Sequence, residues 1–90
     1  MPPDPEILAL ATQVGERLRK LRKSLAVAES CTGGMLGAAL TDVPGSSAYF
    51  LGGVISYADQ VKAQQLSVPQ ATLRRYGAVS EQTAAAMASG

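Results

Sequence analysis

The sequence predicts an α/β domain, with helices layered on both sides of a mainly parallel sheet that is incomplete towards its C-terminus. Two short runs rich in apolar and β-branched residues, at 24–29 and 49–57, are typical of buried strands. Segments of helical composition precede, separate and follow these runs, and this alternation favours parallel strands joined by a helical crossover. We expect one domain over residues 1–90 and, because two strands make a small sheet, a piece of a larger domain.

A first helix is expected over residues 5–23. Its apolar residues recur at alternating spacings of four and three, which gives the helix one apolar stripe: Ile7, Ala11, Val14, Leu18 and Leu21. Its last turns are crowded with cations, which the helix dipole favours there: Arg17, Arg19, Lys20, Arg22 and Lys23. We interpret this basic run as a solvated helix end, with a nucleic-acid contact as the less favoured alternative.

The first strand run, SLAVAE at 24–29, ends at a glycine-containing turn, and helical character resumes at Met35. A buried parallel strand followed by a tight turn and a helix has this pattern. The segment DVPGSS at 42–47 contains a proline-glycine pair and is therefore expected to form a loop.

The second strand run, YFLGGVISY at 49–57, contains the pair Gly52 and Gly53. A glycine pair inside a strand indicates a bulge or a close approach of two backbones. Helices are expected after this strand at 58–66, 70–76 and 81–88, the last with Ser80 as its N-cap.

Bulk composition narrows the classes of function. The chain is 47% hydrophobic and 17% charged, as in ordinary globular proteins. A formal net charge of +1 gives no general attraction to nucleic acids or anionic membranes, so neither is an expected partner. The first residues lack the basic start and apolar run of a signal peptide, and no apolar stretch could span a bilayer. We therefore expect a cytoplasmic protein.

The chain contains no histidine and a single cysteine, Cys31. This excludes an internal disulfide, a Ser-His-Asp or Cys-His pair, and the usual zinc ligand sets within these residues. The carboxylates also lack the spacing of a metal site, so neither a metal nor a cofactor is expected. A catalytic base must come from a lysine, a carboxylate or a tyrosine.

The turn after the first strand is the best candidate for chemistry, and its sequence is Ser30-Cys31-Thr32-Gly33-Gly34. Hydroxyls and free backbone N–H groups at the start of a helix can hold a phosphate or stabilise an oxyanion. The alternative is that Ser30 and Thr32 only cap the following helix, as short Ser/Thr/Gly turns commonly do.

Four blocks of the sequence favour a binding or catalytic role for this turn over a helix cap. They are AESCTGG at 28–34, LTDVPGSSAYFLGGVISY at 40–57, Lys62, and YGAVSEQTAAAMASG at 76–90. In order and spacing they resemble the C-terminal domain of the CinA-type competence/damage-inducible proteins, the nicotinamide-nucleotide amidohydrolase family. The resemblance runs from Leu25 to Gly90. It implies a small-molecule nucleotide substrate, nicotinamide mononucleotide, hydrolysed to nicotinic acid mononucleotide and ammonia.

The resemblance also implies catalytic roles for individual residues. Ser30 matches the proposed nucleophile and Lys62 the proposed base, while Thr32 and Tyr57 match supporting hydroxyls near the reacting amide. A lysine desolvated beside an apolar helix can serve as a base where no histidine is present. As alternatives, Lys62 is a solvent-exposed helix lysine and Tyr57 a core tyrosine at a strand end.

Cys31 needs separate consideration, because Glu29, Cys31 and Lys62 are the residue types of a nitrilase-like amidase triad. The nitrilase spacing is absent, and we therefore interpret Cys31 as a packed side chain beside the nucleophile. Its place in the turn makes it, with Gly33 and Gly34, a candidate for substrate binding.

A second group of candidates for the nucleotide phosphate is Ser46, Ser47, Gly52 and Gly53. Glycine lets the backbone approach a ligand closely, and amides and hydroxyls bind phosphate. Plain turn and bulge formation is the equally favoured alternative.

Members of the family continue beyond the block that ends in MASG, with further strands, a glycine-rich segment and an arginine proposed to bind substrate. Two other classes of function therefore stay open. One is an inactive module that self-associates through apolar surface and an unpaired sheet edge, and the other is a nucleotide-binding module without turnover. We expect a homo-oligomer, given the small size and the apolar content.

Overall fold

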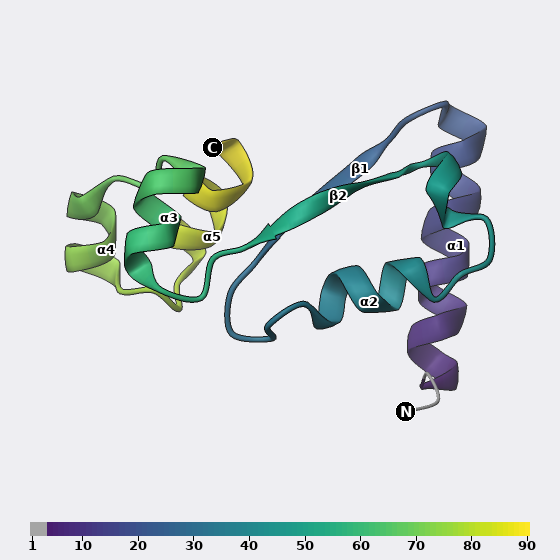
Figure 1. Ribbon diagram of the computed structural model, residues 1–90, viewed down its shortest axis with the longest axis horizontal. Coiled ribbons are helices and arrows are strands. Elements are labelled where there is room, and N and C mark those ends of the chain that lie inside the picture. The colour runs from purple at the N-terminus through teal and green to yellow at the C-terminus, as the bar shows by residue number, and fades with distance from the viewer. Residues whose placement is uncertain (1–3) are drawn as a thin grey trace. The chain divides into compact units, whose positions relative to one another are not determined.

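The computed structural model describes residues 4–90; residues 1–3, on which part of the expectation about the N-terminus rests, lie outside it. No helix of this described part is both long and apolar enough to cross a membrane. The elements in chain order are α1 (Pro5–Leu21), β1 (Leu25–Glu29), α2 (Met35–Thr41), the 3-10 helix η1 (Ser46–Ala48), β2 (Phe50–Ile55), α3 (Asp59–Leu66), α4 (Gln70–Tyr76) and α5 (Glu81–Ser89) (Figure 1).

The strands β1 and β2 pair in a two-stranded sheet, and the predicted α/β class with a parallel sheet is confirmed. At the start of the pair the Leu25 N–H donates to the Tyr49 carbonyl at 2.8 Å, and at its end the Ser56 N–H donates to the Glu29 carbonyl at 2.7 Å. Both strands therefore run in the same direction, and their carboxyl ends meet at the same edge of the sheet.

The glycine pair in β2 marks a close approach of the two strands, which is one of the two structures expected for it. A Cβ atom on Gly53 would lie only 2.6 Å from the carbonyl oxygen of Val27 in β1. Gly52 has a φ of 141°, a backbone conformation that residues with a side chain rarely adopt.

The chain forms two compact units, each described here by itself. One contains the chain up to Val27 together with Gly34–Gly53, and the other contains Ala28–Gly33 together with Val54–Gly90. Each strand therefore contributes its first residues to the first unit and its last residues to the second.

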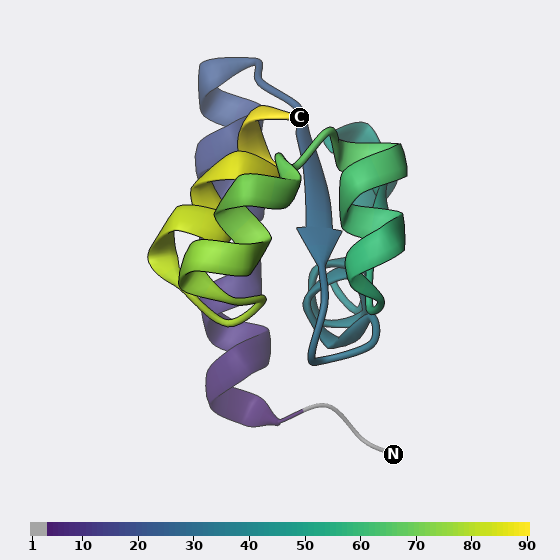
Figure 2. The same ribbon diagram turned by 90° about the vertical axis from the view of Figure 1, so that its left-hand side faces the viewer.

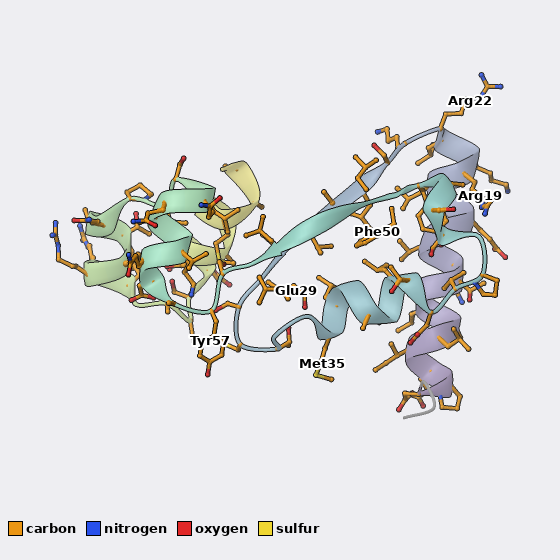
Figure 3. The ribbon with its side chains drawn as sticks, viewed as in Figure 1. Arg19, Arg22, Glu29, Met35, Phe50 and Tyr57 are labelled. Carbon is orange, nitrogen blue, oxygen red and sulfur yellow. The ribbon has the colours of Figure 1, made fainter. Side chains whose placement is uncertain are left out.

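Tyr49 is the centre of packing in the first unit. Its side chain is buried, and a Cβ atom on Gly15 of α1 would overlap its hydroxyl. The Arg19 guanidinium lies 5.7 Å from the centre of the Tyr49 ring and donates a 2.7 Å hydrogen bond to the Gly45 carbonyl. These contacts attach α1 to the segment before β2. Arg19, near the end of α1, is labelled in Figure 3.

The buried face of α1 differs from the predicted stripe. Its buried and half-buried residues are Leu8, Ala11, Thr12, Gly15 and Leu18, whereas three members of the predicted stripe are exposed: Ile7, Val14 and Leu21. The Tyr49 ring packs against Gly15 of the helix. Glycine has no side chain, so the spacing of apolar side chains gives no sign of this contact. The basic residues at the end of the helix are exposed, as interpreted from the sequence.

The second unit has its own core, formed by Leu66, Val68 and Met87. α5 packs against α3 and α4. The three helices form one group in Figure 1, and α4 and α5 lie next to each other in Figure 2. Ala28 of β1 and Val54 of β2 pack against this core, which attaches the ends of both strands to the helices. The predicted N-cap of α5 is confirmed, because the Ser80 hydroxyl accepts a 3.1 Å hydrogen bond from the Thr83 N–H.

Candidate active site

The turn that follows β1 has the geometry expected of a tight Gly-containing loop. The Gly33 N–H donates to the Ser30 carbonyl at 3.0 Å, and Gly33 and Gly34 have φ values of 63° and 113°. Ser30 is half-buried, while Cys31 and Thr32 are exposed. Gly34, and neither Ser30 nor Thr32, is the N-cap residue of α2, and Gly34 makes no side-chain capping hydrogen bond.

Cys31 is a free and exposed cysteine. Our interpretation of it as a packed side chain is therefore wrong. The turn bends away from the strand after Glu29, and a residue in such a turn no longer shares the buried environment of the strand before it.

Glu29, the last residue of β1, is a buried carboxylate with 6% of its surface exposed. The Thr32 hydroxyl donates to its Oε1 atom at 2.9 Å. A carboxylate in such a place requires hydrogen bonds, because burying an unpaired charge is costly. The bond from Thr32 holds the turn against the end of the strand.

The end of β2 is tied to the same residue through its backbone. Ser56 donates two hydrogen bonds to the Glu29 carbonyl, one from its N–H at 2.7 Å and one from its hydroxyl at 3.0 Å. The next residue, Tyr57, has 72% of its surface exposed, and its side chain extends away from the backbone in Figure 3. The alternative of a core tyrosine is therefore wrong, and the phenol is open to a ligand.

Lys62 on α3 is fully buried, with 0% of its surface exposed, so the alternative of a solvent-exposed lysine is also wrong. Its Nζ atom donates to the carbonyls of Ser56 at 2.8 Å and Tyr57 at 3.1 Å and lies 3.8 Å from a carboxylate oxygen of Asp59. These acceptors compensate the cost of burying an amine. Within residues 4–90 no hydrogen bond joins Lys62 to Ser30.

The hydrogen bonds of the second unit thus form one connected set: Thr32 to Glu29, Ser56 to Glu29, and Lys62 to Ser56 and Tyr57. It links the turn after β1, the segment after β2 and the first turns of α3. Three of the four predicted catalytic residues take part in it through side chain or backbone, and Ser30 lies between Glu29 and Thr32 in the sequence.

The predicted phosphate ligands Ser46, Ser47, Gly52 and Gly53 belong to the first unit, as does Gly34. Ser46 is buried and its N–H donates to the Val43 carbonyl at 3.1 Å, whereas Ser47 is exposed. Both serines lie in η1, which extends the expected loop into a turn of 3-10 helix. Their contact with a nucleotide stays a prediction.

Two residues of the hydrogen-bonded set were not among the predicted site residues. Glu29 could have been found from the sequence, because it is a charged residue at the end of an apolar strand, and such a residue needs hydrogen-bond partners when it is buried. Ser56 carried none that distinguishes it from other strand-end serines. Among the described residues, no group of three or more cysteine, aspartate or glutamate side chains is placed to hold a metal ion.

The sequence profile described as CinA C-terminal domain matches residues 7–90 of this chain. The chain belongs to the CinA C-terminal domain family. Over 81 residues it is 60% identical to the CinA-like protein of Synechococcus sp. (strain CC9902), a match that covers 90% of this chain and 19% of the relative. The CinA-like protein of a Synechocystis strain is 58% identical over 81 residues, with 90% and 20% covered. The predicted family is thereby confirmed.

Solved structures share the fold of this CinA C-terminal domain chain. The crystal structure of competence/damage inducible protein CihA from Agrobacterium tumefaciens superimposes with a TM-score of 0.93 at 41% sequence identity. That match covers 100% of this chain and 55% of the solved one. The chain therefore spans about half of this solved CinA protein and about a fifth of the curated relatives.

Proposed function

We propose that this CinA C-terminal domain chain is an amidohydrolase that converts nicotinamide mononucleotide to nicotinic acid mononucleotide and ammonia. The observation that carries the proposal is the connected hydrogen-bond set at the carboxyl ends of β1 and β2, which includes the fully buried Lys62 and the exposed residues Thr32 and Tyr57. Ligands of parallel α/β sheets bind outside the carboxyl ends of the strands. The resemblance of the sequence blocks to the nicotinamide-nucleotide amidohydrolases supplies the substrate.

In the proposed reaction, the Ser30 hydroxyl oxygen attacks the carboxamide carbon while its proton passes to the Lys62 amine. The carbon–nitrogen bond then breaks, and the nitrogen takes up this proton and leaves as ammonia. Water adds to the resulting ester, the bond to Ser30 breaks, and nicotinic acid mononucleotide is released with the hydroxyl restored. The exposed hydroxyls of Thr32 and Tyr57 contact the reacting amide in this scheme.

The hydrogen bonds of Lys62 are compatible with its role as the base. A lysine nitrogen has three positions besides its bond to carbon, all three occupied by hydrogens in the ammonium form. The carbonyls of Ser56 and Tyr57 accept from two of these positions. The third position carries a lone pair in the neutral amine, and that lone pair is the one that would take the proton from Ser30.

A second candidate is a domain that binds the nucleotide without turning it over. One observation favours it: in the part of the chain that the structure describes, Lys62 is hydrogen-bonded to two carbonyls and not to Ser30. In that case Lys62 acts as a structural link between α3 and the end of β2, and Ser30 binds the amide without attacking it.

Ammonia release from nicotinamide mononucleotide separates the two candidates. The chain of 90 residues is assayed beside a longer chain that contains the rest of a family domain, and the thermal unfolding of both is measured with and without nucleotide. Ammonia release that Ser30→Ala abolishes supports the amidohydrolase. A rise in the unfolding temperature with nucleotide, without any ammonia, supports the binding domain instead.

A further inference from the structure

The direction of the hydrogen bond between Thr32 and Glu29 has a consequence for substrate selection. A threonine hydroxyl has one hydrogen to donate and two lone pairs that accept, whereas an ionised carboxylate only accepts. The single hydrogen of Thr32 is donated to Glu29 over 2.9 Å, so the hydroxyl can offer only lone pairs to a ligand. Thr32 is an exposed residue, so a ligand can approach it from solvent.

We infer that Glu29 is a positioning residue that fixes Thr32 as a hydrogen-bond acceptor and thereby selects a carboxamide over a carboxylate. The inference rests on the proposed function, in which Thr32 contacts the reacting group. The NH2 group of a carboxamide donates hydrogen bonds and satisfies the Thr32 oxygen. The carboxylate of the product has only acceptor oxygens, which would face the lone pairs of Thr32 without a hydrogen between them.

The burial of Glu29 keeps its carboxylate in place as the acceptor of the Thr32 hydrogen bond. With 6% of its surface exposed, the carboxylate cannot turn into solvent and release the Thr32 hydrogen at little cost. Its backbone is held as well, because the Glu29 carbonyl accepts two hydrogen bonds from Ser56. The hydroxyl of Thr32 therefore keeps the same polarity before and after the reaction, which favours binding of the amide and release of the acid.

The test compares the affinities for nicotinamide mononucleotide and nicotinic acid mononucleotide by titration calorimetry. Ser30→Ala is present in every variant, so that the amide is not consumed. A site that accepts a hydrogen bond from its ligand discriminates strongly against an analogue without the donor, and we expect at least about tenfold preference for the amide. The preference is expected to persist in Thr32→Ser, which retains the hydroxyl.

Two further variants remove the polarity of the site. Thr32→Val deletes the oxygen, and Glu29→Gln provides a side-chain amide that can itself donate to Thr32 and free its hydrogen. Each is expected to bring the two affinities to within about threefold of each other, a change of the size of one neutral hydrogen bond. If Glu29→Gln fails to fold, the comparison of Thr32→Val with Thr32→Ser decides, because Thr32 is exposed.

Two results would overturn the inference. The first is equal affinity for the two nucleotides when Glu29 and Thr32 are both unchanged. The second is an undiminished preference for the amide in Thr32→Val. Either result would show that this hydrogen bond does not select the substrate, although the nucleotide still binds. Binding of neither nucleotide overturns the proposed function, and this inference with it.

Discussion

The Nζ atom of Lys62 donates a 2.8 Å hydrogen bond to the carbonyl oxygen of Ser56, and so ties α3 to the segment that follows β2. Ser56 in turn donates to Glu29, the last residue of β1. A buried lysine therefore helps to hold together the two strand ends around which the proposed active site is built. Its loss should be visible in stability as well as in turnover.

Replacing Lys62 by methionine is expected to lower the free energy of unfolding by about 1–3 kcal/mol. The apolar side chain fills a similar space but leaves the carbonyls of Ser56 and Tyr57 without their donor, and unsatisfied buried acceptors are destabilising. Lys20→Met on the exposed side of α1 is the matched control and should change stability by less than about 0.5 kcal/mol. Urea denaturation measures both, and equal effects of the two substitutions would contradict the structural role of Lys62.

The order of the elements could be predicted because it depends on local patterns. The two apolar runs gave both strands to within two residues at each end, and Pro69, Gly77 and Ser80 delimit the helices α4 and α5. The buried face of α1 could not be predicted, since it depends on the Tyr49 ring packing against a glycine far away in the sequence. Such a contact leaves no periodic signal.

The candidate site was predictable only in part for the same reason. The turn after β1 could be found from its glycines and hydroxyls, and the resemblance to the family drew attention to Lys62. The burial of Lys62 was not evident from its own helix, because the carbonyls that accept its hydrogen bonds lie in the preceding segment. The acceptor role of Thr32 depends on Glu29 and likewise requires three-dimensional information.

The chain is expected to self-associate through the exposed apolar side of α1. Ile7, Leu10 and Val14 follow each other at helical spacing and are exposed, Leu10 with 62% of its surface. Leu10→Glu is expected to weaken association by at least about tenfold, because it places a charge in an apolar contact. Light scattering across a concentration series measures this, with the neighbouring exposed Gln13→Glu as a control for charge. A stable monomer of the parent chain at all concentrations would contradict the prediction.

Chelating agents should leave ammonia release unchanged. Among residues 4–90 no cluster of three potential metal ligands is formed, and in the proposed reaction the attacking group is the serine hydroxyl and the base is an amine. The measurement is the rate in the presence of EDTA, with and without added zinc or magnesium. An activity that EDTA abolishes and a metal restores would show that the proposed mechanism is incomplete.

The exposed thiol of Cys31 should be dispensable for turnover. It lies beside the proposed nucleophile, and a thiolate there would be the competing attacking group. Cys31→Ser is expected to retain at least about a tenth of the parent rate, whereas Ser30→Ala should lose at least about a hundredfold. If Cys31→Ser is folded but inactive while Ser30→Ala is active, the nucleophile is the thiol.

The most direct test of the central claim is the rate of ammonia release in Ser30→Ala, Lys62→Ala and the double variant. If the serine and the lysine act as one unit, each single substitution removes at least about a hundredfold of the rate, and the double variant is little worse than either. Lys62→Arg should fail as well, since a guanidinium keeps its proton and cannot act as a base. Near-normal ammonia release by folded Lys62→Arg, or losses that simply multiply in the double variant, would contradict a Ser30–Lys62 mechanism.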